Sequence, residues 1–296
     1  MRRAEKAGAR RRIGWKHRAV LASAVILIVL AVMLFWNPWR AEAPTETAGP
    51  QTEATATTTQ TPERVMRALV YDSLYREFPN DELLRNITET LRRAGYTVDV
   101  YVGVNATLDP LVALHRYGLV IIRAHGAYNG DPESGRPLGA YIYTGLHYAE
   151  AKALYGDYID ESLENGDLAL GVIPPPGQPL TKELLKKLPR YVTVSPRFFK
   201  KQLSKLPGTV VVFAGCYGLD DDRLGEVFVS KGASAFISWK GNITWTHMDR
   251  VLRVLVAALA RGDDPAAALS LAMRTVGPDP VTHSVLEMVP SQGAGV

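Results

Sequence analysis

Two short apolar segments of this chain end at side chains that can do nucleophilic and acid–base chemistry. Residues 119–124 lead to His125, and residues 209–215 lead to Cys216, which is the only cysteine. Both segments contain β-branched residues in the pattern of a buried parallel strand, and the carboxyl ends of such strands meet at one edge of a sheet. We therefore predict that His125 and Cys216 share one site.

A thiol beside an imidazole can cleave an acyl bond. The imidazole takes the thiol proton to give the nucleophilic thiolate, and later protonates the leaving amine. Gly215 and Gly218 flank Cys216, which lets a substrate backbone come close, and a helix expected just after the cysteine would favour the thiolate through its dipole. The alternatives are that the cysteine is a small buried hydrophobe and that the histidine only caps a turn.

The elements that position this pair follow from the alternation of strand-like and helix-like segments after residue 66. This alternation predicts an α/β domain with a mainly parallel sheet covered by helices. The predicted strands are 66–71, 96–102, 119–125, 140–144, 167–173, 191–194, 209–213 and 233–240. The predicted helices lie between Asn80 and Gly95 and over 111–117, 221–231, 245–261 and 265–275. The residues between the two motifs are rich in Gly and Pro, which indicates an elaborated loop region beside the site.

The N-terminal residues do not have the composition of a globular domain. Residues 1–18 carry eight lysines and arginines, and residues 19–36 are uncharged and apolar over 18 residues, or roughly 27 Å of helix. We therefore predict a basic cytoplasmic segment at 1–18 and a transmembrane signal-anchor at 19–39, with the C-terminal domain extracytoplasmic. A cleaved signal peptide is the alternative, because residues 41–43 (Ala-Glu-Ala) resemble a processing site.

The charge of the chain divides at the same place. Residues 40–62 are mostly Thr, Ala, Glu, Gln and Pro, so we predict a disordered stalk there and a globular domain over 63–296. Residues 1–18 together with Arg40 carry +8, and since the whole chain carries +4, residues 41–296 carry −4. The positive charge therefore belongs to the anchor, which argues against nucleic acid as a partner. A single cysteine excludes an internal disulfide and a zinc cluster of several cysteines, and the sequence indicates no metal site and no cofactor.

The two strand-ending motifs resemble those of a known family. His125-Gly126 and residues 214–218 (Ala-Gly-Cys-Tyr-Gly) are similar to the motifs of clan CD cysteine peptidases, the group of caspases, legumain, gingipain and clostripain, together with CHAT domains. The resemblance covers about residues 66–262, including 71–80 (Tyr-Asp-Ser-Leu-Tyr-Arg-Glu-Phe-Pro-Asn) and 232–239 (Gly-Ala-Ser-Ala-Phe-Ile-Ser-Trp).

This resemblance implies a three-layer caspase-like sandwich and a Cys–His dyad. His125 would be the general base and acid, Cys216 the nucleophile, and the backbone N–H groups of Gly126 and Cys216 the oxyanion hole. The chain would then be a membrane-anchored, extracytoplasmic cysteine endopeptidase that acts on peptide or protein substrates.

Three residues near the cysteine are candidates for substrate binding. Asp220 and Asp221 closely follow Cys216, so their carboxylates are placed to receive a basic side chain, although acidic residues also commonly open a solvated helix. Trp239 ends a neighbouring predicted strand, where an aromatic ring either walls a substrate pocket or packs in the core.

Two other classes of function stay open. In a class I amidotransferase-like cysteine hydrolase the histidine partner follows the cysteine in the sequence, which makes His247 or His283 the candidate. The strand-end position of His125 argues against that class. A non-catalytic caspase-like ectodomain that binds a ligand or a surface protein would keep the fold without needing the dyad.

Overall fold

A six-stranded sheet forms the centre of the domain and positions both motifs. The computed structural model describes residues 65–130, 137–175, 177–178 and 181–291. The strand order is β10-β9-β8-β3-β1-β2, and all neighbours are parallel except β9 and β10. These strands are β1 (Arg67–Asp72), β2 (Thr97–Val102), β3 (Leu119–Arg123), β8 (Val210–Ala214), β9 (Ala235–Lys240) and β10 (Val285–Pro290).

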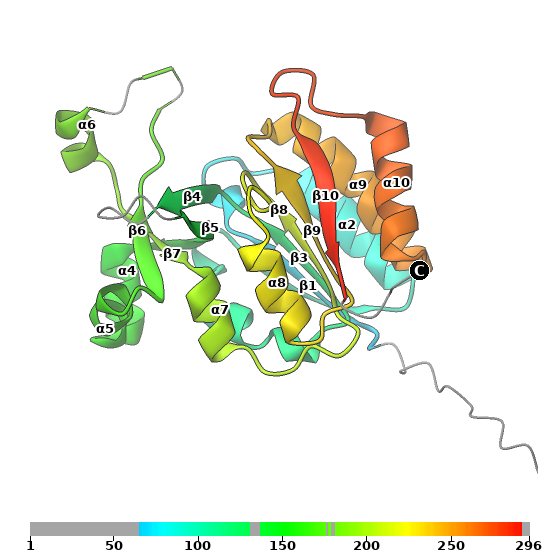
Figure 1. Cartoon of the computed structure of the whole chain (residues 1–296), viewed down its shortest axis with the longest axis horizontal. Coiled ribbons are helices and arrows are strands. Elements are labelled where there is room, and N and C mark those ends of the chain that lie inside the picture. Colours follow the sequence, from blue (N-terminus) through cyan, green and yellow to red (C-terminus); the bar gives the residue numbers. More distant parts are fainter. Residues whose placement is uncertain (1–64, 131–136, 176, 179–180, 292–296) are drawn as a thin grey trace, which may run out of the picture. The chain divides into compact units, whose positions relative to one another are not determined.

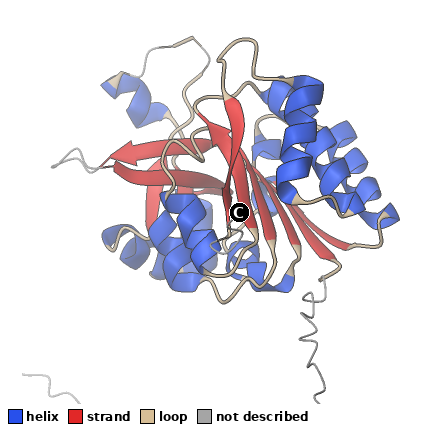
Figure 2. Cartoon of the chain, turned by 45° about the vertical axis from the view of Figure 1, so that its right-hand side comes forward, coloured by secondary structure: helices blue, strands red, loops and turns tan. Residues whose placement is uncertain are grey.

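Helices cover both faces of this sheet (Figures 1 and 2). Ile122 and Phe213 enter one buried cluster with residues of α7 and α8, whereas Ile121 and Val212 enter another with residues of α2, α9 and α10. Both faces of the inner strands β1, β3, β8 and β9 are therefore buried, which explains why these strands read as mainly apolar runs. The helices are α2 (Asp81–Arg93), α3 (Asp109–Val112), α4 (Tyr148–Tyr155), α5 (Tyr158–Glu164), α6 (Lys182–Lys187), α7 (Pro196–Gln202), α8 (Arg223–Ser230), α9 (Trp245–Arg261) and α10 (Pro265–Val276), with short 3-10 helices η1 (Leu74–Arg76), η2 (Gly103–Asn105) and η3 (Leu114–Arg116).

The segment between the two motifs contains a second, antiparallel sheet. Its order is β4-β5-β7-β6, with β4 (Gly126–Gly130), β5 (Pro137–His147), β6 (Leu168–Gly171) and β7 (Tyr191–Val194). Because β3 ends at Arg123 and β4 begins at Gly126, His125 lies at the passage from one sheet to the other.

Most of the predicted elements are confirmed. The first three strands are parallel neighbours in the order β2-β1-β3, and the Asn80 side chain caps α2 by accepting a hydrogen bond from Leu83 N–H at 3.0 Å. The helix expected over 111–117 is instead the two short pieces α3 and η3, and the helix after Cys216 begins at Arg223 rather than near 221. The strands β4 and β10 were not predicted.

The predicted basic segment (1–18), signal-anchor (19–39) and stalk (40–62) lie outside the described residues. In the part of the chain that the structure describes, no helix combines the length and the apolar character needed to cross a membrane. All described residues belong to one compact unit, Gln60–Val296.

Candidate active site

His125 and Cys216 occupy equivalent positions after neighbouring strands. β3 and β8 are adjacent and parallel, with Arg123 paired to Ala214 at the end of the ladder. Each candidate residue follows its paired residue by two positions, and both line one cleft of about 650 Å³. The structure therefore brings the imidazole and the thiol to a common cavity at the carboxyl edge of the sheet.

The imidazole of His125 lies among aromatic rings. The ring centroids of Trp245, Tyr143 and Phe78 are 4.8, 5.7 and 6.1 Å from its own. Its Nε2 atom is buried and has no hydrogen-bond partner among the described residues. Burial, reinforced by the positive charge of Arg123, lowers the pKa of His125 to about 4. The ring is therefore neutral at neutral pH and has a free site for a proton.

The thiol of Cys216 is held by the loop between β9 and α9. Its Sγ donates to Asn242 Oδ1 at 3.0 Å and accepts from Ile243 N–H at 3.5 Å. Burial raises the pKa of the thiol above its ordinary value; the Ile243 N–H opposes this rise, and the charges of Asp220 and Asp279 add to it. The helix that was expected directly after the cysteine, α8, begins seven residues later.

Glycines of the two motifs pack against protein atoms. A Cβ atom on Gly126 would lie 2.0 Å from the carbonyl oxygen of Cys216, and one on Gly218 would lie 2.0 Å from Ser238 Oγ. No side chain fits at either position, so the ends of β3, β8 and β9 come close together. The space beside Gly218 that the sequence suggested for a substrate backbone is thus occupied by Ser238.

The predicted oxyanion-hole residues, Gly126 and Cys216, both line the cleft. Gly126 stands opposite Ile142 of β5, and Tyr143 N–H donates to the His125 carbonyl at 3.0 Å. In an antiparallel pair this pattern makes Gly126 a non-hydrogen-bonded position. Its N–H group therefore points away from β5 and takes no part in the β4–β5 ladder.

The two aspartates after Cys216 have different roles in the fold. Asp220 lines the cleft, and its carboxylate accepts Gly241 N–H at 2.6 Å. Asp221 accepts the Tyr128 hydroxyl at 3.0 Å and Arg223 N–H at 3.1 Å, so it joins β4 to the start of α8. Of this pair, Asp220 is the carboxylate that faces the cavity.

Trp239 lies in the core rather than at the cleft. Its side chain is 1% exposed and belongs to the cluster beneath α9 and α10, because the alternation along β9 directs it to the same face as Ile237. The tryptophan that lines the cavity is Trp245, at the first position of α9. The sequence analysis chose Trp239 and missed Trp245, because the position of Trp245 at the cavity depends on where the β9–α9 loop runs.

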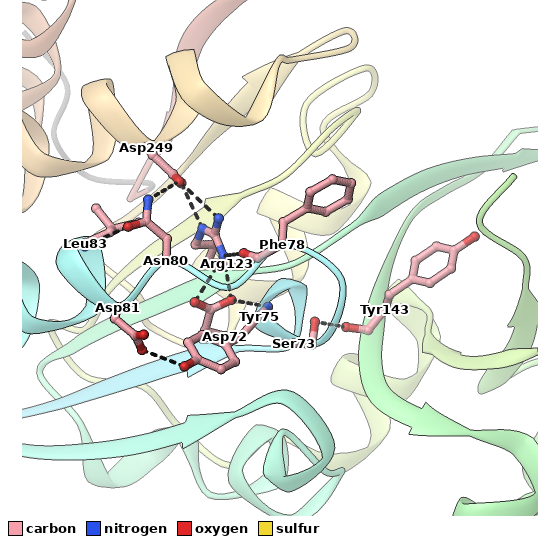
Figure 3. Close-up of polar contacts among 10 residues, drawn as sticks. All are labelled: Asp72, Ser73, Tyr75, Phe78, Asn80, Asp81, Leu83, Arg123, Tyr143 and Asp249. Atoms are coloured by element: carbon pink, nitrogen blue, oxygen red, sulfur yellow. Dashed lines mark hydrogen bonds and ion pairs between the residues drawn. The ribbon is translucent and has the colours of Figure 1, made fainter. Parts of the chain in front are cut away.

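A buried ion network around Arg123 lies next to Phe78 (Figure 3). The Arg123 side chain is 3% exposed and contacts two carboxylates, Asp72 at 3.0 Å and Asp249 at 2.8 Å. Arg123 also donates to the Phe78 carbonyl at 3.2 Å, and the amide of Asn80 donates to Asp249 at 2.9 Å. One guanidinium thereby joins the ends of β1 and β3 to the start of α2 and to α9.

This network fixes the rings around the histidine. Phe78 is held through its carbonyl group, and Trp245 lies one helical turn before Asp249 on α9. The Phe78 and Trp245 rings stack on each other with centroids 5.1 Å apart. Burial raises the pKa of Asp72 to about 6 against the opposing charge of Arg123, so the carboxylate is still ionised at neutral pH. The sequence signal for this network was Arg123, a charged residue at the end of the otherwise apolar strand β3.

The histidines that follow Cys216 in the sequence do not reach the cavity. His247 Nε2 contacts the Gly277 carbonyl at 3.0 Å, and His283 is exposed, with a φ of 59°. Within the described residues, the cleft that contains Cys216 is lined by neither of them.

No protein-family model matches the chain, and no curated protein gives a sequence match. The structure itself establishes an α/β domain with a mixed, mainly parallel six-stranded sheet and a small antiparallel sheet.

Proposed function

We propose that this chain is a membrane-anchored, extracytoplasmic cysteine endopeptidase that uses Cys216 and His125 as a catalytic dyad. The observation that carries the proposal is the placement of both side chains on one cleft, two residues beyond the paired ends of adjacent parallel strands. The helices on both faces of the sheet and the resemblance of the two motifs to clan CD peptidases support a caspase-like sandwich. The anchor and the extracytoplasmic location rest on residues 1–62 of the sequence.

In this mechanism the pair starts neutral. Cys216 releases Asn242 by rotation about its Cα–Cβ bond, and His125 takes the thiol proton as the sulfur attacks the substrate carbonyl carbon. The N–H groups of Gly126 and Cys216 stabilise the resulting oxyanion. The imidazolium then protonates the leaving amine, and water hydrolyses the thioester to restore the thiol and release the carboxylic acid. Because burial lowers the pKa of His125, its protonated form is a strong acid toward the amine.

The carboxylate of Asp220 gives this site its charge preference. Asp220 is exposed and lines the cleft, and its carboxylate accepts a hydrogen bond from Gly241 N–H, a neutral group that leaves its negative charge in place. A lysine or arginine side chain next to the scissile bond would place its charge near this carboxylate. Asp221 contributes less in this proposal, because its oxygens already bind Tyr128 and Arg223.

The test is covalent labelling of the full chain in detergent. A chloromethyl ketone on a short peptide that ends in lysine should label wild type at Cys216, and Cys216→Ala and His125→Ala should abolish labelling. His283→Ala is the matched control, since His283 is an exposed histidine away from the cleft, and it should label like wild type. Labelling that survives in His125→Ala but is lost in His283→Ala would refute the dyad and favour an amidotransferase-like hydrolase.

A non-catalytic ectodomain is the second candidate, and one observation favours it. The thiol donates its hydrogen bond to Asn242 rather than to His125, and burial disfavours the charged form of both groups. A binding domain could keep such a neutral pair without using it. This function would be supported if iodoacetamide modified Cys216 of the folded protein while peptidyl probes with varied side chains did not.

A further inference from the structure

The strand that follows His125 has an unpaired outer side. β4 is the first strand of the small sheet and pairs with β5 on one side; no other described strand pairs with it. Its first three residues, Gly126, Ala127 and Tyr128, all line the cleft that contains Cys216. The open edge of β4 therefore runs along the cavity, beginning next to the dyad.

Alternate backbone groups of β4 are directed to this edge. Gly126 and Tyr128 stand opposite Ile142 and Ala140, and the Tyr143 N–H bond to His125 makes both of them non-hydrogen-bonded positions of the β4–β5 pair. Each consequently presents an N–H and a carbonyl group away from β5. These groups need hydrogen-bond partners that an apolar ligand does not supply.

The two faces of β4 meet different surroundings. On the face of Gly126 and Tyr128 lies the turn after Cys216, as shown by the contact of Gly126 with the Cys216 carbonyl and by the Tyr128 bond to Asp221. On the opposite face, His125 lies near Tyr143, whose hydroxyl donates to the Val172 carbonyl at 3.3 Å. On the face of Gly126 and Tyr128, the cavity is thus lined by the carboxylate of Asp220. On the opposite face it is lined by the ring of Tyr143 and by residues 172–174 (Val-Ile-Pro).

We propose that the substrate is an extended peptide that adds to the free edge of β4 as an antiparallel strand. The proposal rests on the proposed function and specifies how the substrate is held. The residue that carries the scissile carbonyl pairs with Gly126, so that the Gly126 N–H group meets the carbonyl oxygen that becomes the oxyanion. The residue two positions before it pairs with Tyr128. Antiparallel pairing continues the pattern of this sheet, and residues that face each other then exchange both hydrogen bonds.

This register determines how the substrate side chains alternate. The residue at the scissile bond and the residue two before it project to the face of Asp220, because directly paired residues share a face. The residue between them projects to the face of Tyr143 and residues 172–174. The inference therefore describes a substrate with a basic residue at the cleavage point, an apolar residue before it, and no proline where an N–H group must donate to β4.

Backbone methylation of a probe tests the pairing. The probe is acetyl-Thr-Val-Lys chloromethyl ketone, applied to the full chain in detergent. N-methylation of its threonine removes the N–H that donates to the Tyr128 carbonyl and should lower the labelling rate constant at least tenfold. N-methylation of its valine, whose N–H points away from β4, should change the rate constant less than threefold. Equal effects at the two residues, or a larger effect at valine, would overturn the proposal.

A variant pair tests the same bond from the protein side. Tyr128→Pro removes the outward N–H group without removing a β4–β5 bond, and Tyr128→Ala removes the same side-chain contacts while keeping that N–H. We expect labelling by the unmethylated probe to be at least tenfold slower in Tyr128→Pro than in Tyr128→Ala, with equal alkylation of Cys216 by iodoacetamide as the check on folding. Equal probe labelling in the two variants would overturn the strand pairing while leaving the dyad intact. If the unmethylated probe fails on wild type although iodoacetamide reacts, the proposed function itself fails.

Discussion

The buried network around Arg123 offers a quantitative test through Asp249→Asn. Asp249 accepts Arg123 Nε at 2.8 Å, Arg123 Nη2 at 3.0 Å and Asn80 Nδ2 at 2.9 Å. An asparagine keeps the shape but loses the charge and turns one acceptor into a donor that faces these N–H groups. Removing one partner of a buried ion pair costs about 3–5 kcal/mol. Because Arg123 keeps Asp72 as a second carboxylate, we expect the lower end, about 3 kcal/mol.

The matched control is Glu82→Gln. Glu82 pairs with Arg253 at 3.0 Å and joins the same two helices, α2 and α9, but the two side chains are 74% and 36% exposed. Removing such a surface pair should change the free energy of unfolding by no more than about 0.5 kcal/mol. For a domain of this size, about 3 kcal/mol corresponds to a fall in Tm of roughly 6–12 °C, measured by circular dichroism on the full chain in detergent. If both variants unfold at the same temperature, the buried network does not hold the helices together.

Three further outcomes follow from the cavity and the core. Because burial raises the pKa of Cys216, the rate of its alkylation by iodoacetamide should still increase with pH above pH 9.0, the ordinary pKa of a thiol. A rate that reaches a plateau below that pH would contradict the buried environment of the thiol. His125 should titrate by NMR near pH 4 rather than 6.5. As the pH falls, the unfolded chain binds a proton at this histidine before the folded chain does, so the free energy of unfolding should fall by about 3 kcal/mol between pH 6.5 and 4 relative to His125→Gln. If the difference in stability between wild type and His125→Gln is independent of pH, the assigned environment of His125 is wrong. Trp239→Phe should lower the free energy of unfolding and leave the rate constant for peptidyl labelling of the folded protein unchanged. Trp245→Phe should lower that rate constant with a smaller loss of stability. The opposite result would contradict the assignment of Trp245 to the cavity and of Trp239 to the core.

The inner strands of the central sheet, β1, β3, β8 and β9, were predictable because they are buried on both faces. A run such as residues 210–214 (Val-Val-Val-Phe-Ala) is apolar at every position, and the residues that follow it must then emerge at a sheet edge. The pairing of β3 with β8 did not follow from the sequence order alone, since a whole antiparallel sheet intervenes between them in the chain.

The strand β4 was missed for a physical reason. Its sequence, Gly-Ala-Tyr-Asn-Gly, has neither an apolar run nor an apolar–polar alternation, and glycine is unfavourable in strands. The strand exists because it continues directly from His125 and pairs with β5. The start of α8 was displaced for a similar local reason: the Asp221 side chain bonds Arg223 N–H and holds a turn where a helix was expected.

The loop that holds the thiol has a consequence for the modification of an exported chain. Residues 242–244 (Asn-Ile-Thr) form an acceptor pattern for N-linked sugar, yet the Asn242 side chain lines the cleft and binds Cys216 Sγ. A glycan attached to its Nδ2 atom before folding would leave the Oδ1 acceptor in place but would put a bulky sugar beside the cleft that contains Cys216. Asn86 and Asn105 stand in the same acceptor pattern and are exposed, but they do not line the cleft, so sugars at those positions leave the cavity free. In a glycosylating export route, the yield of competent protein would therefore depend on how often Asn242 escapes modification before the chain folds.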